Sequence, residues 1–228
     1  MRPHFPVTVI VPVRNAAAHL PAALASVLAQ RPQPAEILLI DGGSTDRSVA
    51  IATAHGVRVI HQRGRGLAAA RNEAILASRS PWIAFCDGDD RWAPHSLAVR
   101  IRALETNPAA RAVIGHVVRE HLPGTEAAVA QSERVAQPIP GFTPGALLAA
   151  RQTFDAIGIF DEVLAIGADS DWFVRLQESA QPVLQIADTV LFKGVRSNSL
   201  SAQVGAYRSE LLIVARRFIN QRRGARNP

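Results

Sequence analysis

Val7-Thr-Val-Ile-Val-Pro-Val13 is followed directly by Arg14-Asn15, and this stretch decides how the rest of the chain is interpreted. An unbroken run of β-branched and apolar residues is typical of a strand that is buried on both faces of a sheet. The polar pair at its end places hydrogen-bonding groups at the edge of that sheet. The stretch therefore predicts the first strand of a parallel sheet, with functional groups at its carboxyl end.

The same alternation of a buried strand and a helix recurs through the first half of the chain. Further strands are expected at Glu36–Asp41, Val57–His61 and Trp82–Cys86, and helices at His19–Gln30, Asp46–His55, Leu67–Ser78 and Pro94–Thr106. Such repetition implies right-handed crossovers. We therefore expect an α/β fold with a doubly wound, mostly parallel sheet that binds ligands beyond the carboxyl ends of its strands.

The second half of the chain has a less regular pattern. We expect strands at Ala112–Val118, Val183–Ile186 and Thr189–Lys193, an extended segment at Gly145–Ala150, a loop at Arg119–Pro140, and helices at Arg151–Ile157, Ala168–Ser179 and Val204–Gln221. No linker or repeat marks a boundary. The prediction is a single domain over residues 1–228, divided into a first half (about 1–110), a smaller mixed half (about 111–203) and a basic C-terminal helix and tail (204–228).

Composition excludes several classes of protein. With 228 residues, 48% of them hydrophobic, the chain is long enough to bury a core without disulfides or a metal. The single cysteine, Cys86, excludes a disulfide framework and fits a reducing compartment. No apolar run approaches the ~20 residues that span a bilayer, and Met1–Pro6 lacks the apolar core of a signal peptide. These features predict a cytoplasmic protein.

Lys193 is the only lysine among 25 basic residues, and the formal net charge is +6. An excess of arginine suits phosphates and other anionic partners, although coding composition explains the bias equally well. Several arginines gather in residues 207–226 beside an apolar stripe. A segment of this kind is expected first as a helix packed on the domain with a solvated basic face. Peripheral contact of a basic amphipathic helix with the inner face of an anionic membrane is the alternative.

Polar side chains follow the predicted strands, and the acidic ones suggest chemistry. Asp87 and Asp89 alternate at a strand end, where carboxylates are able to hold Mg²⁺ or Mn²⁺; a solvated acidic turn is the alternative. Asp41 ends a buried strand and needs a donor, which a nucleobase, a ribose or a simple turn would supply. Gly66 opens a helix and could admit a ligand, while Arg71 on that helix could meet phosphate.

Four segments, in this order and spacing, resemble the nucleotide-sugar-binding half of the family 2 glycosyltransferases, an inverting group with the GT-A fold. They are Val9-Ile-Val-Pro-Val-Arg-Asn15, Ile40-Asp-Gly-Gly-Ser-Thr-Asp46, Gly66-Leu-Ala-Ala-Ala-Arg-Asn72 and Phe85-Cys-Asp-Gly-Asp-Asp-Arg-Trp92. The resemblance is strong over about Val7–Glu105. It continues more weakly through Phe160–Glu162 and Gly167–Leu176 to the end of the chain.

The resemblance implies a reaction and a set of site residues. The reaction is transfer of a sugar of the hexosyl type from a nucleotide diphosphate-sugar, most simply a UDP-sugar, to an acceptor that the sequence does not identify; no nucleic-acid partner is implied. Asp89, with Asp87, is implied as the ligand of Mg²⁺ or Mn²⁺. Asp169 is implied as the general base, with Asp171 as the alternative. The implied nucleotide contacts are Pro12, Val13, Arg14, Asn15, Asp41, Gly66, Arg71 and Asp87.

Three positions depart from the family's pattern. Gly42 and Ala168 stand where the family often has acidic residues, and Arg196 stands where it often has a histidine that ligates the metal. Arginine cannot bind a metal, so we expect either that Arg196 contacts the diphosphate or that the site binds its metal weakly. These departures keep open a non-catalytic, degenerate nucleotide-binding relative. A nucleotidyltransferase is a further alternative, but such an enzyme normally needs a glycine-rich loop where this chain has Pro12–Asn15.

Overall fold

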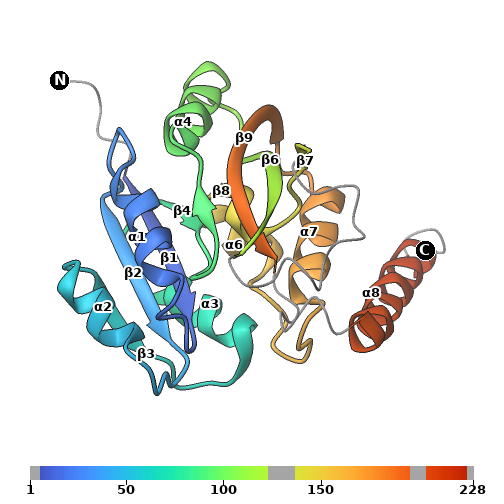
Figure 1. Cartoon of the computed structure of the whole chain (residues 1–228). Coiled ribbons are helices and arrows are strands. Elements are labelled where there is room, and N and C mark those ends of the chain that lie inside the picture. Colours follow the sequence, from blue (N-terminus) through green and yellow to red (C-terminus); the bar gives the residue numbers. More distant parts are fainter. Residues whose placement is uncertain (1–5, 123–136, 196–203, 225–228) are drawn as a thin grey trace.

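One mixed β-sheet runs through both halves of the chain (Figure 1). The computed structural model describes residues 6–122, 137–195 and 204–224. Within them the strand order is β3-β2-β1-β4-β8-β6-β9-β5, and β7 lies beside β6. The first four strands in this order pair in parallel. Their bounds are Arg58–His61 for β3, Glu36–Asp41 for β2, Val7–Val13 for β1 and Trp82–Phe85 for β4.

The remaining strands pair in mixed directions. The strand β8 is antiparallel to both β4 and β6, whereas β9 is parallel to β6 and antiparallel to β5. The bounds are Leu147–Ala150 for β8, Ala112–His121 for β6, Val183–Val195 for β9, Arg91–Trp92 for β5 and Ile139–Pro140 for β7. A short 3₁₀ turn, η1, covers Pro144–Ala146.

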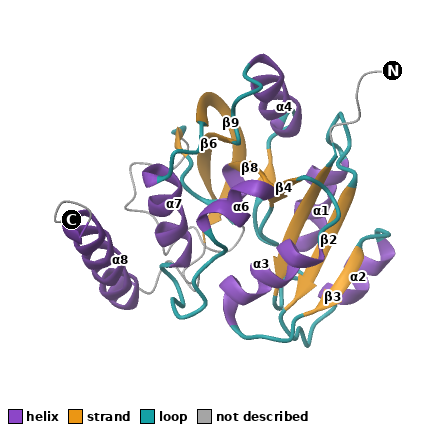
Figure 2. Ribbon diagram, turned by 180° about the vertical axis from the view of Figure 1, so that it is seen from behind, coloured by secondary structure: helices purple, strands orange, loops and turns teal. Residues whose placement is uncertain are grey.

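Helices cover both faces of the sheet because the buried strands alternate their side chains between two cores. Val9 and Val11 of β1 face the core that contains α1 (Leu20–Leu28) and α4 (Ser96–Thr106). Ile10 faces the other core, which contains α3 (Gly66–Ala77), α6 (Arg151–Ile157) and α7 (Ala168–Glu178). In the two opposite views, α1 lies in front of the sheet in Figure 1, and α3 and α6 lie in front in Figure 2. The doubly wound α/β prediction is confirmed.

The other helices begin and end within a few residues of their predicted bounds. They are α2 (Ser48–Ala54), α3 (Gly66–Ala77), α6 (Arg151–Ile157), α7 (Ala168–Glu178) and α8 (Val204–Gly224). The last of these lies beside α7, away from the sheet (Figures 1 and 2). Among the described residues, no helix combines the length and the apolar character that crossing a membrane requires.

The strands of the second half differ from the sequence-based expectation. A single strand, β9, replaces the two short strands predicted at Val183–Ile186 and Thr189–Lys193. It stays continuous because β6 pairs with it on both sides of a register shift near His116. Arg119–His121, predicted to begin a loop, extend β6 by pairing with Lys193–Val195. The short strands β5 and β7 were not predicted, since two residues carry no periodicity.

Candidate active site

The turns after β1 and β2 lie side by side and are joined by hydrogen bonds. Asn15, in the left-handed conformation with φ 53°, accepts the Thr45 N–H at 2.8 Å through Oδ1. The Asn15 N–H in turn donates to Ser44 Oγ at 2.9 Å. Ser48 Oγ accepts the buried Ala16 N–H at 2.9 Å. The predicted Pro12–Asn15 turn is therefore held against the Asp41 turn by side-chain-to-backbone bonds, with Arg14 and Asn15 exposed at the surface.

Asp41 ends β2 next to Val13, its register partner in β1. Its buried carboxylate accepts the Ser44 N–H at 3.1 and 3.2 Å, and His61 Nδ1 lies 3.4 Å from Oδ2. Part of the donor requirement of this carboxylate is thus met within the chain. Gly66, also predicted at the nucleotide site, begins α3 with φ +86°, a conformation that favours glycine.

Arg71 joins two predicted site residues from opposite halves of the chain. Its guanidinium is only 1% exposed. Nη1 lies 2.5 Å from Asp169 Oδ1, and Nη2 lies 2.9 and 3.0 Å from the two oxygens of Asp87. Asp87 follows β4, whereas Asp169 is in the first turn of α7. We call residues 87–90 the acidic turn. The arginine therefore fixes the acidic turn, in the first half of the chain, relative to the start of α7 in the second half.

The charges in this cluster shift one another's protonation. Burial raises the pKa of the Asp169 carboxyl, and the attraction of Arg71 counteracts part of that rise. Burial alone would lower the pKa of Arg71, but the carboxylates of Asp169 and Asp87 raise it overall. A raised pKa makes a carboxylate a stronger base. The helix dipole at the start of α7 acts in the opposite sense, because it favours the ionised form.

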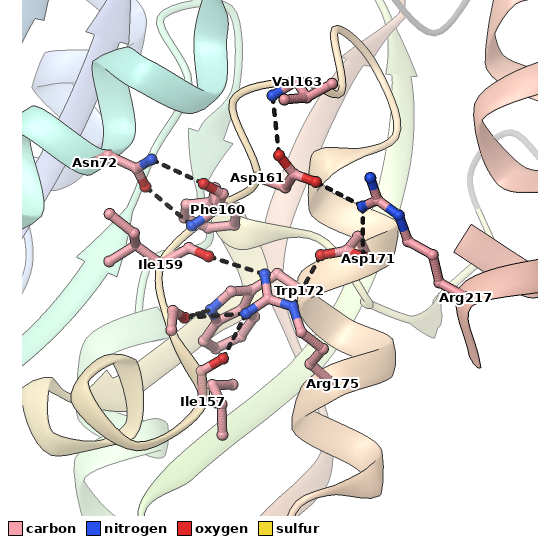
Figure 3. A network of polar contacts seen from close by, with 11 residues as sticks. Asn72, Ile157, Ile159, Phe160, Asp161, Val163, Asp171, Trp172, Arg175 and Arg217 are labelled. Atoms are coloured by element: carbon pink, nitrogen blue, oxygen red, sulfur yellow. Dashed lines mark hydrogen bonds and ion pairs between the residues drawn. The ribbon is translucent and has the colours of Figure 1, made fainter. Parts of the chain in front are cut away.

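Asp171 belongs to a different network from Asp169, although the two are only two residues apart. Its Oδ2 accepts from Arg175 Nε at 2.8 Å, and Arg217 Nη1 of α8 lies 4.0 Å from Oδ1 (Figure 3). Two residues along an α-helix differ by about 200° in direction, which separates these side chains. The structure thus brings Asp169 to Arg71 and Asp87, and brings Asp171 to the arginines of α7 and α8.

The segment between α6 and α7 is held at several points, which fixes where α7 begins. Asn72 donates to the Phe160 carbonyl at 2.9 Å and accepts the Phe160 N–H at 3.0 Å (Figure 3). Further along, the Glu210 carboxylate of α8 accepts the backbone N–H groups of residues 165, 166 and 167 at 3.1, 2.9 and 2.6 Å. These contacts link α3 and α8 to the turn that carries Asp169.

Strand β9 brings a basic residue to the acidic turn. Asp90 is 1% exposed; its Oδ1 accepts the Gly194 N–H at 3.0 Å, and Lys193 Nζ lies 3.5 Å from Oδ2. Burial raises the pKa of Asp90 to about 7 despite the attraction of Lys193. Neither Asp90 nor Lys193 was predicted as a site residue. The sequence did place Asp90 in the acidic cluster with Asp87 and Asp89, and the signal for Lys193 was that it is the only lysine in the chain.

The acidic turn fits a divalent cation in the chemistry of its donors. Asp87 and Asp89 offer hard oxygen ligands, although both oxygens of Asp87 also accept from Arg71. In the part of the chain that the structure describes, no three His, Cys, Asp or Glu side chains are grouped to hold a metal. Mg²⁺ commonly binds one or two carboxylates and completes its shell with water and substrate phosphates. The pair therefore fits a metal that arrives with a phosphate ligand.

Arg196, predicted at the diphosphate, lies in residues 196–203, outside the described part of the chain.

Comparison with known proteins identifies the family. Residues 8–160 match the model of glycosyl transferase family 2. The chain belongs to this family. The succinoglycan biosynthesis protein ExoU of Rhizobium meliloti is 42% identical over 97 residues, which are 40% of this chain and 28% of ExoU. Across the first three curated relatives the matched region covers only 26% to 33% of the relative's length.

Solved structures share the fold at low sequence identity. Residues 1–349 of S. aureus TarS, in complex with UDP-GlcNAc, superimpose with a TM-score of 0.70 at 15% identity, covering 87% of this chain and 61% of that fragment. The mannosyltransferase PcManGT from Pyrobaculum calidifontis, in complex with GDP-Man and Mn²⁺, gives a TM-score of 0.67 at 22% identity, covering 94% and 64%. These likenesses confirm the GT-A type of fold that the resemblance implied.

Proposed function

We propose that this chain is a metal-assisted, inverting glycosyltransferase that takes a sugar from a nucleotide diphosphate-sugar, most simply a UDP-sugar, and transfers it to an acceptor hydroxyl. The observation that carries the proposal is the buried Arg71 bridge, which sets Asp169 within reach of the acidic turn at Asp87. Membership of the family supports the reaction type. The nucleotide-sugar complexes of TarS and PcManGT support the donor class.

In this proposal the nucleotide lies across the carboxyl ends of β1, β2 and β4. The Pro12–Asn15 turn and Asp41 contact the base and ribose, because they share one edge of the sheet. The backbone at Gly66 allows close approach, and Asp87 lies toward the ribose. Arg71 orders the carboxylates around the diphosphate. Arg196 remains a proposed diphosphate contact from the sequence.

Asp169 acts as the general base in this proposal. As the acceptor oxygen attacks the anomeric carbon, its proton passes to Asp169, the new C–O bond forms, and the C–O bond to the diphosphate breaks on the opposite face of the sugar. This in-line displacement inverts the anomeric centre. Burial raises the pKa of Asp169, which strengthens it as a base, and Arg71 keeps it oriented toward the acidic turn.

Asp89 together with Asp87 would hold Mg²⁺ or Mn²⁺ in this scheme. When bound, the cation supplies positive charge for the departing diphosphate. The remaining contribution of the chain is positional: Arg71 and the strand β9 hold the acidic turn in place.

Calorimetric titration with UDP and with GDP, each in the presence of MnCl₂, tests the donor class. Binding of one of them, weakened at least tenfold in Asp89→Asn, is the expected result. Exposed Asp155 on α6 provides a matched control, because Asp155→Asn removes one carboxylate elsewhere. If neither nucleotide binds under any of these conditions, the proposed function is wrong.

A non-catalytic nucleotide-binding role is the second candidate, and Gly42 and Ala168 favour it because each replaces a carboxylate. Slow hydrolysis of the donor sugar by the pure protein distinguishes the two. Release of UDP from a UDP-sugar, abolished by Asp169→Asn, supports the enzyme. Binding without any hydrolysis or transfer supports the non-catalytic alternative. A nucleotidyltransferase finds no comparable support, since residues 8–160 match a glycosyl transferase model.

We also propose that α8 contacts an anionic membrane peripherally, at the cytoplasmic face. Leu212 and Ile213 are 60% and 43% exposed, and exposed Arg208 and Arg216 lie on the same helix. Apolar and basic side chains together favour the surface of anionic lipid. Sedimentation with phosphatidylglycerol vesicles, but not with phosphatidylcholine vesicles, is expected. If the protein sediments with neither kind of vesicle, the proposed membrane contact is wrong.

A further inference from the structure

Lys193, the only lysine in the chain, places its ammonium group at the acidic turn. It lies on β9, which pairs with β5 through Arg91 opposite Phe192, and β5 follows the acidic turn directly. Its Nζ lies 3.5 Å from Asp90 Oδ2. The Asp90 carboxylate raises the pKa of Lys193, and those of Asp87, Asp89 and Asp169 in the candidate site raise it further. The Lys193 amine therefore stays protonated.

The position of Lys193 is imposed by the backbone next to it. The Gly194 N–H donates to Asp90 Oδ1 at 3.0 Å. A Cβ on Gly194 would lie 2.3 Å from the Asp89 carbonyl oxygen, closer than any side chain allows. Because Gly194 has no side chain, β9 runs directly against the acidic turn. The stem of Lys193 therefore begins at a fixed point beside Asp89 and Asp90.

The contact with Asp90 does not use all the hydrogen-bond donors of the Lys193 ammonium. At 3.5 Å the contact is an ion pair longer than a hydrogen bond, and Asp90 Oδ2 accepts no hydrogen bond from the described residues. The Lys193 side chain is 32% exposed, so a ligand from solvent is able to reach it. Arg71, by contrast, is buried and directs both Nη groups to Asp87 and Asp169.

A cation that is partly open to solvent at this cluster favours an anionic ligand. Among the described residues, the carboxylates of Asp87, Asp89, Asp90 and Asp169 all act on Lys193, and three of them also act on Arg71. A diphosphate entering this site meets excess negative charge unless a positive group faces it. Among the residues described here, Lys193 is the partly exposed cation at this cluster.

We infer that Lys193 binds the diphosphate of the nucleotide, and that this contact lets the protein bind a nucleoside diphosphate without a divalent metal. The inference rests on the proposed function and adds a binding residue to it. Lysine supplies a protonated point charge with several donors, which suits phosphate oxygens.

Calorimetry with UDP and GDP, in MnCl₂ and in EDTA, tests this inference on the full chain. The wild type is expected to keep measurable binding in EDTA. Lys193→Met is expected to lose tenfold or more of its affinity in EDTA, the scale of a lost charged hydrogen bond. In MnCl₂ the same variant should lose less than about threefold, because the metal then supplies charge. Lys193→Arg should keep most of the binding in EDTA.

Arg91→Met is the matched control. Arg91 lies on β5, pairs with Glu120 and stacks over Phe192 beside Lys193, so the variant removes one positive charge nearby without touching the acidic turn. Equal loss in Arg91→Met and Lys193→Met would overturn the inference, because general charge would then explain both. Wild-type binding in MnCl₂ but not in EDTA would overturn it while leaving the proposed function intact. Absence of binding in both would overturn the proposed function itself.

A double variant covers the case in which Lys193→Met alone fails to fold because Asp90 is left buried without a partner. Asp90→Asn with Lys193→Met removes both charges and keeps an oxygen for the Gly194 N–H. If Lys193 contacts the ligand, the double variant still binds at least tenfold more weakly than wild type in EDTA. Recovery to wild-type affinity would overturn the inference, because Lys193 would then serve only Asp90.

Discussion

The two sides of the candidate site are held together by different interactions. At the ends of β1 and β2, side chains that include Asn15, Ser48 and the Asp46 carboxylate accept backbone N–H groups of the neighbouring turn. Around the acidic turn, ion pairs join segments that are far apart in sequence: Arg71 and Asp169 are separated by 98 residues, and Asp90 and Gly194 by 104. The first side is held by hydrogen bonds to backbone groups, and the second largely by ion pairs between side chains.

This difference suggests how each side responds to a ligand. Hydrogen bonds to backbone groups depend on direction and keep the turns in place whatever charge arrives. Ion pairs depend on the local balance of charge, which an anionic ligand or a cation changes. We therefore expect the β1 and β2 turns to behave as a preformed surface, and the acidic turn to adjust its contacts when a diphosphate binds.

The largest expected effect comes from Asp169 on the charged side. Asp169→Asn should lower the turnover number for sugar transfer by about 10³-fold, since general-base catalysis contributes roughly 10² to 10⁴. Nucleotide affinity should change less than about threefold. Steady-state kinetics and calorimetry measure the two separately.

Asp171→Asn is the matched control for this prediction, because Asp171 lies two residues away and pairs with Arg175 instead. Its turnover should stay within about tenfold of the wild type. A larger loss of turnover in Asp171→Asn than in Asp169→Asn would mean that Asp171, and not Asp169, is the general base.

Arg71→Met should have the next largest effect, seen in stability. It leaves Asp87 and Asp169 without their shared cation, and breaking one side of a buried pair costs about 3 kcal/mol of unfolding free energy. Arg58→Met is the comparison, because its pair with Glu36 is more exposed and should cost less than ~1 kcal/mol. Urea unfolding measures both; equal losses would mean that the Arg71 bridge is not a special feature of the charged side.

At the β1 and β2 turns, Ser48→Ala should cost about 1 kcal/mol of unfolding free energy. The substitution leaves the buried Ala16 N–H without its acceptor, a loss of roughly 1–3 kcal/mol, and it also removes the hydroxyl that donates to Asp46 Oδ1 at 2.6 Å. Thr53→Ala on the same helix removes a hydroxyl that bonds only to the Val49 carbonyl and should be close to neutral. If salt changes the Ser48→Ala effect as strongly as it changes Arg71→Met, the contrast between the two sides is wrong.

The smallest expected effect is local. Glu210→Ala removes the acceptor for three backbone N–H groups before α7, so α8 should detach more often from the start of α7. Trypsin should then cleave after Arg216 and Arg217 faster, while the thermal midpoint moves by only a few degrees. Leu212→Ala on the exposed face of the same helix is the control, and faster cleavage there as well would point to helix propensity instead.

Much of the first half could be predicted because its signals are local. Each strand from β1 to β4 is a short apolar run bounded by polar residues, and each helix follows at once. The second half depends on long-range pairing. The strand β9 reads as two short strands because Asp188 and its neighbours interrupt the apolar pattern, and only the β6 pairing shows that it continues.

The candidate site divides in the same way. Sequence motifs indicated Asp41, Arg71, Asp87 and Asp169, because each belongs to a recognisable segment. They could not indicate that Arg71 bridges Asp87 and Asp169, because the sequence around Arg71 on α3 does not show that α7 packs beside it. Lys193 and Glu210 were not found for the same reason. Each acts through residues more than forty positions away.

The solitary lysine at the acidic turn also offers an experimental handle. Protein grown with lysine labelled at the side-chain nitrogen will give one ammonium resonance, and that resonance comes from Lys193. Its chemical shift and exchange with water will respond to any anion or metal that enters beside Asp90. Lys193 is therefore a single spectroscopic reporter beside the acidic turn, and its use requires no mutation and no attached dye.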